Sequence, residues 1–268
     1  MTITQLASRN NPLLKTIRLV SAGSRRAPRS LVAAEGIRVL EEVDRAGCDI
    51  EAVVISEHFG SAAREKVLLD VWQSKGVRRY RIADPLFESV SAVRTPQGAI
   101  ALVRVPELSL DALVPAKNPL ILFACGIQDP GNLGTLIRTA AAASASMVCT
   151  AKSTVSPRNP KAIRSSAGAF FLLPLVEHVA TSDFRNYCDS HSIRLYRTDS
   201  HQGMLYTQAD LRSPCAILLG NEGSGLAEED FGGLPAIRIS MAEGVESLNV
   251  AAAGAVLFFE ALRQRQNL

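Results

Sequence analysis

The strongest constraint on the fold is an alternation of apolar runs with helix-like segments along the C-terminal half of the chain. Strands are predicted at residues 120–124, 147–150, 171–176, 193–196, 216–219 and 237–239. Helices are predicted at residues 133–143, 160–167 and 183–190, and again from residue 250 onwards. This spacing is typical of an α/β fold with a mostly parallel sheet and helices on both faces. Ligands on such sheets bind in the loops that follow the carboxyl ends of the strands.

The N-terminal part also alternates, over a shorter length. Helices are predicted at residues 13–20, 31–46 and 62–74, and strands at residues 52–56, 78–82 and 98–105. Asp84 is predicted to cap a further helix that has Pro85 at its first position. A proline-containing stretch separates the two parts. We therefore predict a smaller α/β domain at residues 1–106, a linker at 107–118 and a second domain at 119–268.

The charges are distributed unevenly, although the net charge is only +3. Residues 1–106 carry 16 Lys and Arg against 11 Asp and Glu, whereas residues 107–268 carry 13 against 15. No acid occurs in the first 34 residues, which hold Arg9, Lys15, Arg18, Arg25, Arg26 and Arg29. A basic block of this kind suggests a polyanionic partner, although a solvated basic face and an Arg-rich transit peptide are alternatives.

Composition narrows the class of protein. Five cysteines without C-x-x-C spacing argue against a disulfide scaffold and favour a reducing, cytoplasmic setting. Cys188 and His191 are three residues apart, but a metal site needs more ligands, so no metal is expected. No apolar run is as long as the ~18 residues of a membrane span, so no membrane association is expected.

Three loops that follow predicted strands carry the polar residues of a candidate site. The first, DPGNLGTLIRTA, contains Asn132 as a plausible helix cap and Arg138. The second, LLGNEGSGL, has three glycines between residues 220 and 225, and Glu222 at its centre. The third, between a strand and an apolar helix, holds Ser247 and Asn249, which could cap that helix. Each loop alone could be an ordinary cap or turn, but together they predict one ligand site.

These motifs resemble those of the SpoU (TrmH) branch of the SPOUT RNA methyltransferases. The segment NPKAIRSSAG at residues 159–168 and IRISMAEGVESLNVAAAGAVLFFEALRQ are similar to the family's as well. In the N-terminal part, SRNNPLLKTIR, AAEGIRVLEE and TPQGAIALV resemble the family's small substrate-binding domain. The resemblance implies a C-terminal trefoil-knotted α/β domain, a smaller L30e-like α/β domain and a homodimer.

The resemblance also implies the chemistry. Family members transfer a methyl group from S-adenosyl-L-methionine to a ribose 2′-hydroxyl. The implied cofactor contacts are Leu219, Gly220, Asn221, Gly223, Ile239, Met241 and Leu248. The implied catalytic residues are Asn132, Arg138, Glu222, Ser247 and Asn249. Arg138 is proposed in the family as the base, but Arg keeps its proton in proteins, so we expect it to orient the substrate or stabilise negative charge.

The substrate expected from the resemblance is structured RNA. The extra N-terminal domain looks more like that of members that modify 23S-type ribosomal RNA than like the minimal transfer-RNA members. Arg164, on residues similar to the family's, is expected to bind RNA together with the six N-terminal cations. A transfer-RNA methyltransferase, or a non-catalytic RNA-binding or assembly protein that kept the fold, are the alternatives.

Overall fold

The computed structural model describes residues 3–266, which form two compact units. Unit 1 contains the residues up to Glu107 together with Arg158–Phe171, and unit 2 contains Leu108–Pro157 and the residues from Leu172 onwards. The segment Arg158–Phe171, which lies within the proposed domain 119–268, therefore packs with the N-terminal part.

Unit 2 is built on a seven-stranded sheet in the order β10-β12-β9-β11-β6-β7-β8, in which every pairing is parallel. The strands are β6 (Leu120–Ala124), β7 (Met147–Ala151), β8 (Leu175–Val179), β9 (Arg194–Thr198), β10 (Met204–Leu205), β11 (Cys215–Leu219) and β12 (Ala236–Arg238). The central strands β6, β7 and β11 are buried along their whole length, as expected for a parallel sheet covered on both faces. The predicted α/β class with a mostly parallel sheet is confirmed.

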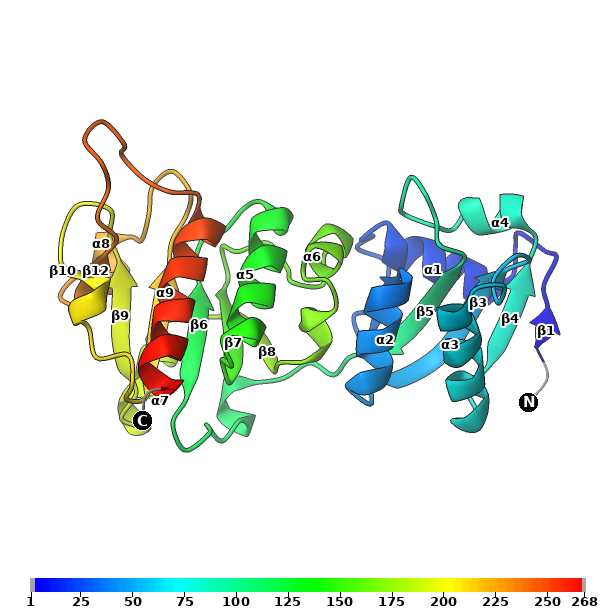
Figure 1. Cartoon of the computed structure of the whole chain (residues 1–268), viewed down its shortest axis with the longest axis horizontal. Helices are drawn as coiled ribbons and strands as arrows, with labels where there is room; N and C mark the ends of the chain where they lie inside the picture. Colours follow the sequence, from blue (N-terminus) through cyan, green and yellow to red (C-terminus); the bar gives the residue numbers. More distant parts are fainter. Residues whose placement is uncertain (1–2, 267–268) are drawn as a thin grey trace. The chain divides into compact units, whose positions relative to one another are not determined.

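Helices cover both faces of this sheet. They are α5 (Pro130–Ala142), α7 (Thr181–Ser190), α8 (Glu228–Phe231) and α9 (Val250–Gln266), with short 3₁₀ turns η1 (Leu110–Ala112) and η3 (Tyr206–Gln208). On one face α5 and α9 lie side by side (Figure 1). On the other face Phe184 of α7 stacks on Phe123 of β6, with ring centroids 4.2 Å apart. Leu110, within the predicted linker, is buried in the same core.

Unit 1 has a five-stranded mixed sheet in the order β1-β4-β3-β5-β2. Its strands are β1 (Thr4–Gln5), β2 (Leu31–Glu35), β3 (Asp49–Ser56), β4 (Arg79–Ile82) and β5 (Ala99–Arg104). Its helices are α1 (Pro12–Ser21), α2 (Ile37–Arg45), α3 (Ala63–Ser74), α4 (Asp84–Glu88) and α6 (Pro160–Ser165), and η2 (Ala169–Phe171) is a 3₁₀ turn. The core is closed by α1, whose Leu14 and Ile17 are fully buried.

Three sequence predictions of local structure were wrong. The helix predicted at residues 31–46 is the strand β2 followed by α2, because Gly36 breaks the chain with a φ of 101° and β2 pairs with β5. The strand predicted at residues 171–176 begins only at Leu175, after η2. Asp84 is the first residue of α4 rather than its cap, and its carboxylate accepts the Glu57 N–H at 3.1 Å.

Arg158 connects the segment Arg158–Phe171 to the rest of unit 1 by hydrogen bonds. Its guanidinium donates from Nη1 to the Arg29 carbonyl at 2.9 Å and from Nη2 to the Pro106 carbonyl at 2.9 Å. The α6 helix that follows packs against β2. These contacts place the basic loop around Arg29 and the first turn of α6 in one compact unit.

Candidate active site

The first loop lies between β6 and α5, and the side chain of Asn132 is not used to cap the helix. Asp129, rather than the predicted Asn132, caps α5, and its carboxylate accepts the Asn132 N–H at 2.9 Å. A carboxylate is a strong cap and also favours the positive end of the helix dipole. Because Asp129 takes this role, the amide of Asn132 is available to contact other loops.

Asn132 is the centre of a hydrogen-bonded group of three side chains. Its Nδ2 donates to Glu222 Oε1 at 3.0 Å, and its Oδ1 accepts from Asn249 Nδ2 at 3.1 Å. The three predicted residues come from three different loops, separated by 90 and 117 positions from Asn132 in sequence. The prediction that these loops meet is therefore supported by direct contacts.

Asn249 caps a helix and also bonds to the polar group around Asn132. Its Oδ1 accepts the Ala251 N–H at 2.9 Å, which caps the start of α9. The other end of the same amide, Nδ2, donates to Asn132. An Asn can do both because its oxygen accepts and its nitrogen donates. Any substitution at Asn249 will consequently affect the helix start and the polar group together.

Glu222 is held as a carboxylate. Partial burial acts to raise the pKa of Glu222, but the hydrogen bond from Asn132 and nearby main-chain N–H groups outweigh it and lower the pKa below its ordinary value. One of these donors is the N–H of Gln128, 3.5 Å from Glu222 Oε2. Glu222 is therefore an acceptor at neutral pH and not a proton donor.

Hydrogen bonds of the Asn221 side chain hold the second loop in place. Its Nδ2 donates to the Gly126 carbonyl at 2.8 Å, and its Oδ1 accepts the Gly223 N–H at 2.9 Å. The loop closes tightly, since a Cβ at Gly220 would lie 2.4 Å from the carbonyl carbon of Gly225. Because both ends of the Asn221 side-chain amide are already hydrogen-bonded, this loop offers a ligand mainly its main-chain groups.

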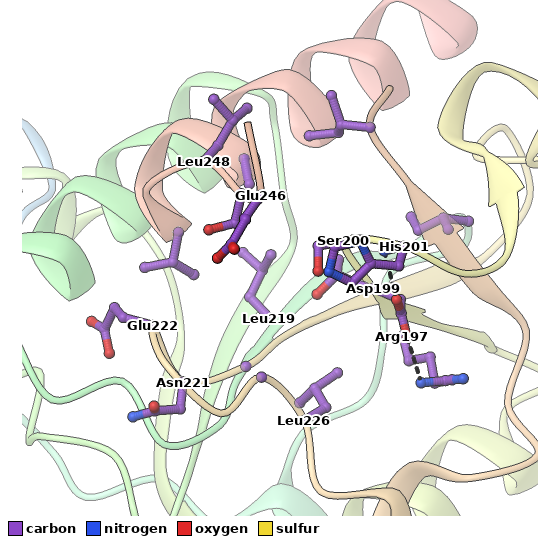
Figure 2. A pocket seen from close by; sticks show the side chains of 18 of the residues that line it. Arg197, Asp199, Ser200, His201, Leu219, Asn221, Glu222, Leu226, Glu246 and Leu248 are labelled. Atoms are coloured by element: carbon purple, nitrogen blue, oxygen red, sulfur yellow. Dashed lines mark hydrogen bonds and ion pairs between the residues drawn. The ribbon is translucent and has the colours of Figure 1, made fainter. Parts of the chain in front are cut away.

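A cavity of about 520 Å³ opens beside these loops, within the roughly 300–1,000 Å³ typical of small-molecule sites. All seven predicted cofactor contacts line it, namely Leu219, Gly220, Asn221, Gly223, Ile239, Met241 and Leu248. Glu222 and Ser247 line it as well. Figure 2 shows Leu219 and Leu248 on one side of the cavity and Asp199, Ser200 and His201 on the other.

The segment at residues 197–202 was missed by the sequence analysis. It ends β9 and forms one wall of the cavity. The signal was present, because the polar run Thr198-Asp199-Ser200-His201 follows an apolar strand of the same parallel sheet. It lacked the glycines that drew attention to the other loops.

Two predicted catalytic residues stand apart from the hydrogen-bonded group. Arg138 is exposed on α5, and Ser247 is exposed in the loop before α9. Among residues 3–266, neither side chain makes a hydrogen bond or ion pair with another residue. The structure thus brings together Asn132, Glu222 and Asn249, and leaves the Arg138 guanidinium available.

Comparison with known proteins identifies the family of the chain. The SpoU rRNA Methylase family matches residues 119–259, more than half of the 268 residues. The chain belongs to the SpoU rRNA methylase family. An MRM3-like substrate binding domain matches residues 11–101.

Other SpoU family proteins are similar over nearly the whole chain. The 23S rRNA (guanosine(2553)-2′-O)-methyltransferase RlmP of Bacillus subtilis is 27% identical over 95% of this chain and 98% of its own length. A solved RNA 2′-O ribose methyltransferase is 32% identical with a TM-score of 0.80, covering 98% of this chain and 100% of that one. An AdoMet-bound rRNA methyltransferase from Sinorhizobium meliloti is 25% identical with a TM-score of 0.85, covering 97% and 98%. This SpoU chain uses S-adenosylmethionine, as predicted.

The predicted RNA-binding cations all lie in unit 1. The exposed ones are Arg9, Lys15, Arg25, Arg26, Arg29 and Arg164. Arg18 is half-buried, and its Nη2 donates to the Arg9 carbonyl at 2.6 Å. Arg164 is on α6, which packs against β2. Burial raises the pKa of Glu35 on β2, and the charge of Arg164 is among the groups that partly oppose this rise. Arg18 therefore supports the fold, whereas the others are free to meet a ligand.

Within residues 3–266 no group of three His, Cys, Asp or Glu side chains could hold a metal ion. Over the same residues, no helix is both long and apolar enough to cross a bilayer. The five cysteines are free thiols.

Proposed function

We propose that this SpoU protein transfers a methyl group from S-adenosylmethionine to a ribose 2′-hydroxyl of RNA, with 23S-type ribosomal RNA as the substrate. The observation that carries the proposal is the Asn132–Glu222–Asn249 group beside the cavity of about 520 Å³. It combines a cavity for a cofactor with fixed polar groups for a hydroxyl. The named 23S rRNA activity of RlmP supports the choice of RNA.

The cavity fits this cofactor in size and lining. Leu219, Ile239 and Leu248 offer apolar surface for a purine ring, and the glycine-rich loop offers main-chain donors and acceptors for polar edges. Bound there, S-adenosylmethionine supplies a methyl group made electrophilic by its sulfonium. The chain itself contributes orientation and exclusion of water rather than a reactive group.

The five predicted catalytic residues would have complementary roles in handling the ribose. A 2′-hydroxyl is a weak acid, so negative charge on its oxygen must be stabilised as the proton leaves. Arg138 keeps its proton and would stabilise that charge or hold an adjacent phosphate. Asn132 and Glu222 would orient the ribose, and Ser247 and Asn249 would close the site beside it.

The exposed cations of unit 1 would bind the RNA backbone. One loop holds Arg25, Arg26 and Arg29. The hydrogen bond from Arg158 to the Arg29 carbonyl connects this loop to the segment that carries Arg164. Phosphate contacts of this kind give affinity that falls with salt and carries little sequence information. Transfer RNA remains the alternative substrate, and the chemistry of the site would be the same.

We also propose a homodimer in the cytoplasm. The face of α9 away from the sheet shows Ala252, Ala255 and Phe259 at helical spacing, and Phe259 is 50% exposed. An apolar stripe of this kind on a surface helix is suited to a second copy of the helix. Phe259→Glu should shift the mass measured by light scattering from two chains to one, and an unchanged mass would count against this interface. Five free thiols support a reducing compartment.

The test of the function is methyl transfer to defined RNAs. Purified protein with tritiated S-adenosylmethionine should label unmodified 23S rRNA from a deletion strain and leave transfer RNA unlabelled. Mapping 2′-O-methyl groups in that strain should show one missing site in 23S rRNA. Labelling of transfer RNA alone would select the alternative substrate, and no labelling of any RNA would sink the enzymatic proposal.

A further inference from the structure

Arg197, at the end of β9, is a mostly buried cation at the edge of the cavity. Its side chain is 13% exposed, and it belongs to the cavity lining. Its Nη1 lies 3.1 Å from Asp199 Oδ2 and 3.5 Å from Glu228 Oε2. Its Nε is buried and has no hydrogen-bond partner among residues 3–266. A guanidinium in such a place is costly unless carboxylates compensate it.

The two carboxylates come from different segments, of which Asp199 lines the cavity and Glu228 lies two residues beyond its lining residue Leu226. Asp199 begins the turn after β9, and its Oδ1 accepts the N–H groups of His201 and Gln202, both at 2.8 Å. Glu228 is the first residue of α8, directly after the glycine-rich loop that forms the other wall. Figure 2 shows the Arg197–Asp199 pair below the turn that carries His201. One guanidinium thus joins both walls.

The Asp199 end of this link stays charged at neutral pH. Burial acts to raise the pKa of Asp199, but the N–H groups of Gln202 and His201 and the charge of Arg197 together lower it. Both carboxylates lie near the same nitrogen, Nη1, whose two N–H groups can each donate to one of them. The rigid plane of the guanidinium fixes the directions of these N–H groups, whereas an ammonium presents a single point charge on a flexible stem.

We propose that Arg197 is a positioning residue for S-adenosylmethionine, holding the turn after β9 and the loop before α8 at the spacing that the cofactor requires. The inference rests on the proposed assignment of the cavity to the cofactor. Because Arg197 acts through the walls and not on the ribose, it sets cofactor affinity and leaves the rate of transfer at saturation nearly unchanged.

The same strand provides a matched control. Arg194 is also on β9 and is also paired with an acid, Asp210, at 3.7 Å. Its side chain is 55% exposed, and it is not part of the cavity lining. Exposed pairs of this kind contribute little, about 0–1 kcal/mol. Replacing Arg194 removes the same charge from the same strand without loosening the walls.

The experiment measures binding and turnover of the full chain. Calorimetry with S-adenosylmethionine should show at least about 10-fold weaker binding for Arg197→Met, corresponding to the roughly 1.4 kcal/mol of a tenfold change. Arg197→Lys should retain part of the affinity, and Arg194→Met should match wild type. With RNA substrate, KM for S-adenosylmethionine should rise in Arg197→Met while kcat stays within about threefold, since the loss is one of uniform binding.

Two further variants distinguish an error in the role of Arg197 from an error in assigning the cavity to the cofactor. Glu228→Gln alters a carboxylate that is 73% exposed, so the fold should tolerate this substitution. The variant should weaken cofactor binding about two- to threefold, and it serves as the test if Arg197→Met does not fold. Ile239→Glu places a charge in the cavity and should abolish binding. Wild-type affinity in folded Arg197→Met, or in Glu228→Gln, overturns the role of Arg197. Wild-type affinity in Ile239→Glu instead overturns the assignment of the cavity to the cofactor.

Discussion

The polar side chains of the two units are arranged in opposite ways. In unit 2, Asn132, Glu222 and Asn249 are hydrogen-bonded to one another and fixed by caps and main-chain contacts. In unit 1, Arg25 and Arg29 project their side chains from an exposed loop. Placing one hydroxyl for reaction needs geometry held to a fraction of an ångström, whereas holding a phosphate backbone needs mainly charge. Substitutions in unit 2 should therefore affect turnover, and those in unit 1 should affect RNA affinity.

The largest effect is expected at Arg138. Arg138→Ala should lower methyl transfer about 10²- to 10³-fold, the usual cost of removing one group that stabilises developing charge. Folding and cofactor binding should be unchanged, because the side chain is exposed and makes no bond to another residue among residues 3–266. The measurements are tritiated methyl transfer and calorimetry with S-adenosylmethionine. Near-wild-type transfer would remove Arg138 from the catalytic set.

Asn132 should show the next largest effect. Asn132→Ala removes both side-chain bonds of the group and leaves Glu222 and Asn249 without this partner, so we expect a loss in kcat of about 10- to 100-fold. Each lost hydrogen bond should also cost about 1 kcal/mol of unfolding free energy. The kcat comes from methyl transfer at saturating cofactor, and the stability from urea unfolding.

Thr135→Ala is the matched control for Asn132. Thr135 is exposed one turn further along α5, and its hydroxyl donates only to the Gly131 carbonyl at 2.9 Å. This variant should keep wild-type kcat. If both variants lose turnover equally, the effect belongs to α5 in general and the special role of Asn132 is refuted.

In unit 1 the expected effect is on RNA binding and its salt dependence. Replacing Arg25, Arg26 and Arg29 with Ala should weaken RNA binding and reduce the slope of log affinity against log salt by up to about 2–3, since each phosphate contact contributes roughly 0.7–0.9. Removing residues 1–29 is a poorer test, because it deletes α1, whose Leu14 is buried in the core. Filter binding at several salt concentrations measures the slope.

A second triple variant of unit 1 carries the same change in charge. Arg45, Arg64 and Arg104 are each paired with an acid of unit 1. Replacing these three with Ala should alter the slope less, because their charges are already compensated. Equal slopes for the two triple variants would mean that net charge alone, and not the free loop, determines RNA affinity.

How much the sequence predicts differs between the same two regions. The meeting of Asn132, Glu222 and Asn249 was predictable because these residues follow apolar strands of a parallel sheet, where loops converge. The cap was assigned to Asn132 instead of Asp129 because both residues suit that position and only the geometry chooses between them. A single helix was wrongly predicted at residues 31–46 because the apolar spacing of α2 continues from β2. The sequence does not show that Gly36 adopts a positive φ and ends the strand. The segment Arg158–Phe171 packs with unit 1 through contacts between residues far apart in the sequence, which no local pattern predicts.

The smallest effect concerns pH and sharpens the comparison within unit 2. The pKa of Glu222 is lowered in the folded chain, so its carboxylate contributes stability that is present above its ordinary pKa and is lost as pH falls through the lowered value. Wild type should therefore lose more thermal stability than Glu222→Gln when the pH is lowered from 6 to about 3, by an amount kept small because the group is exposed. Melting temperatures at several pH values measure this difference. Parallel curves for the two proteins would show that the hydrogen bonds from Asn132 and the nearby main-chain N–H groups do not favour the charged form of Glu222.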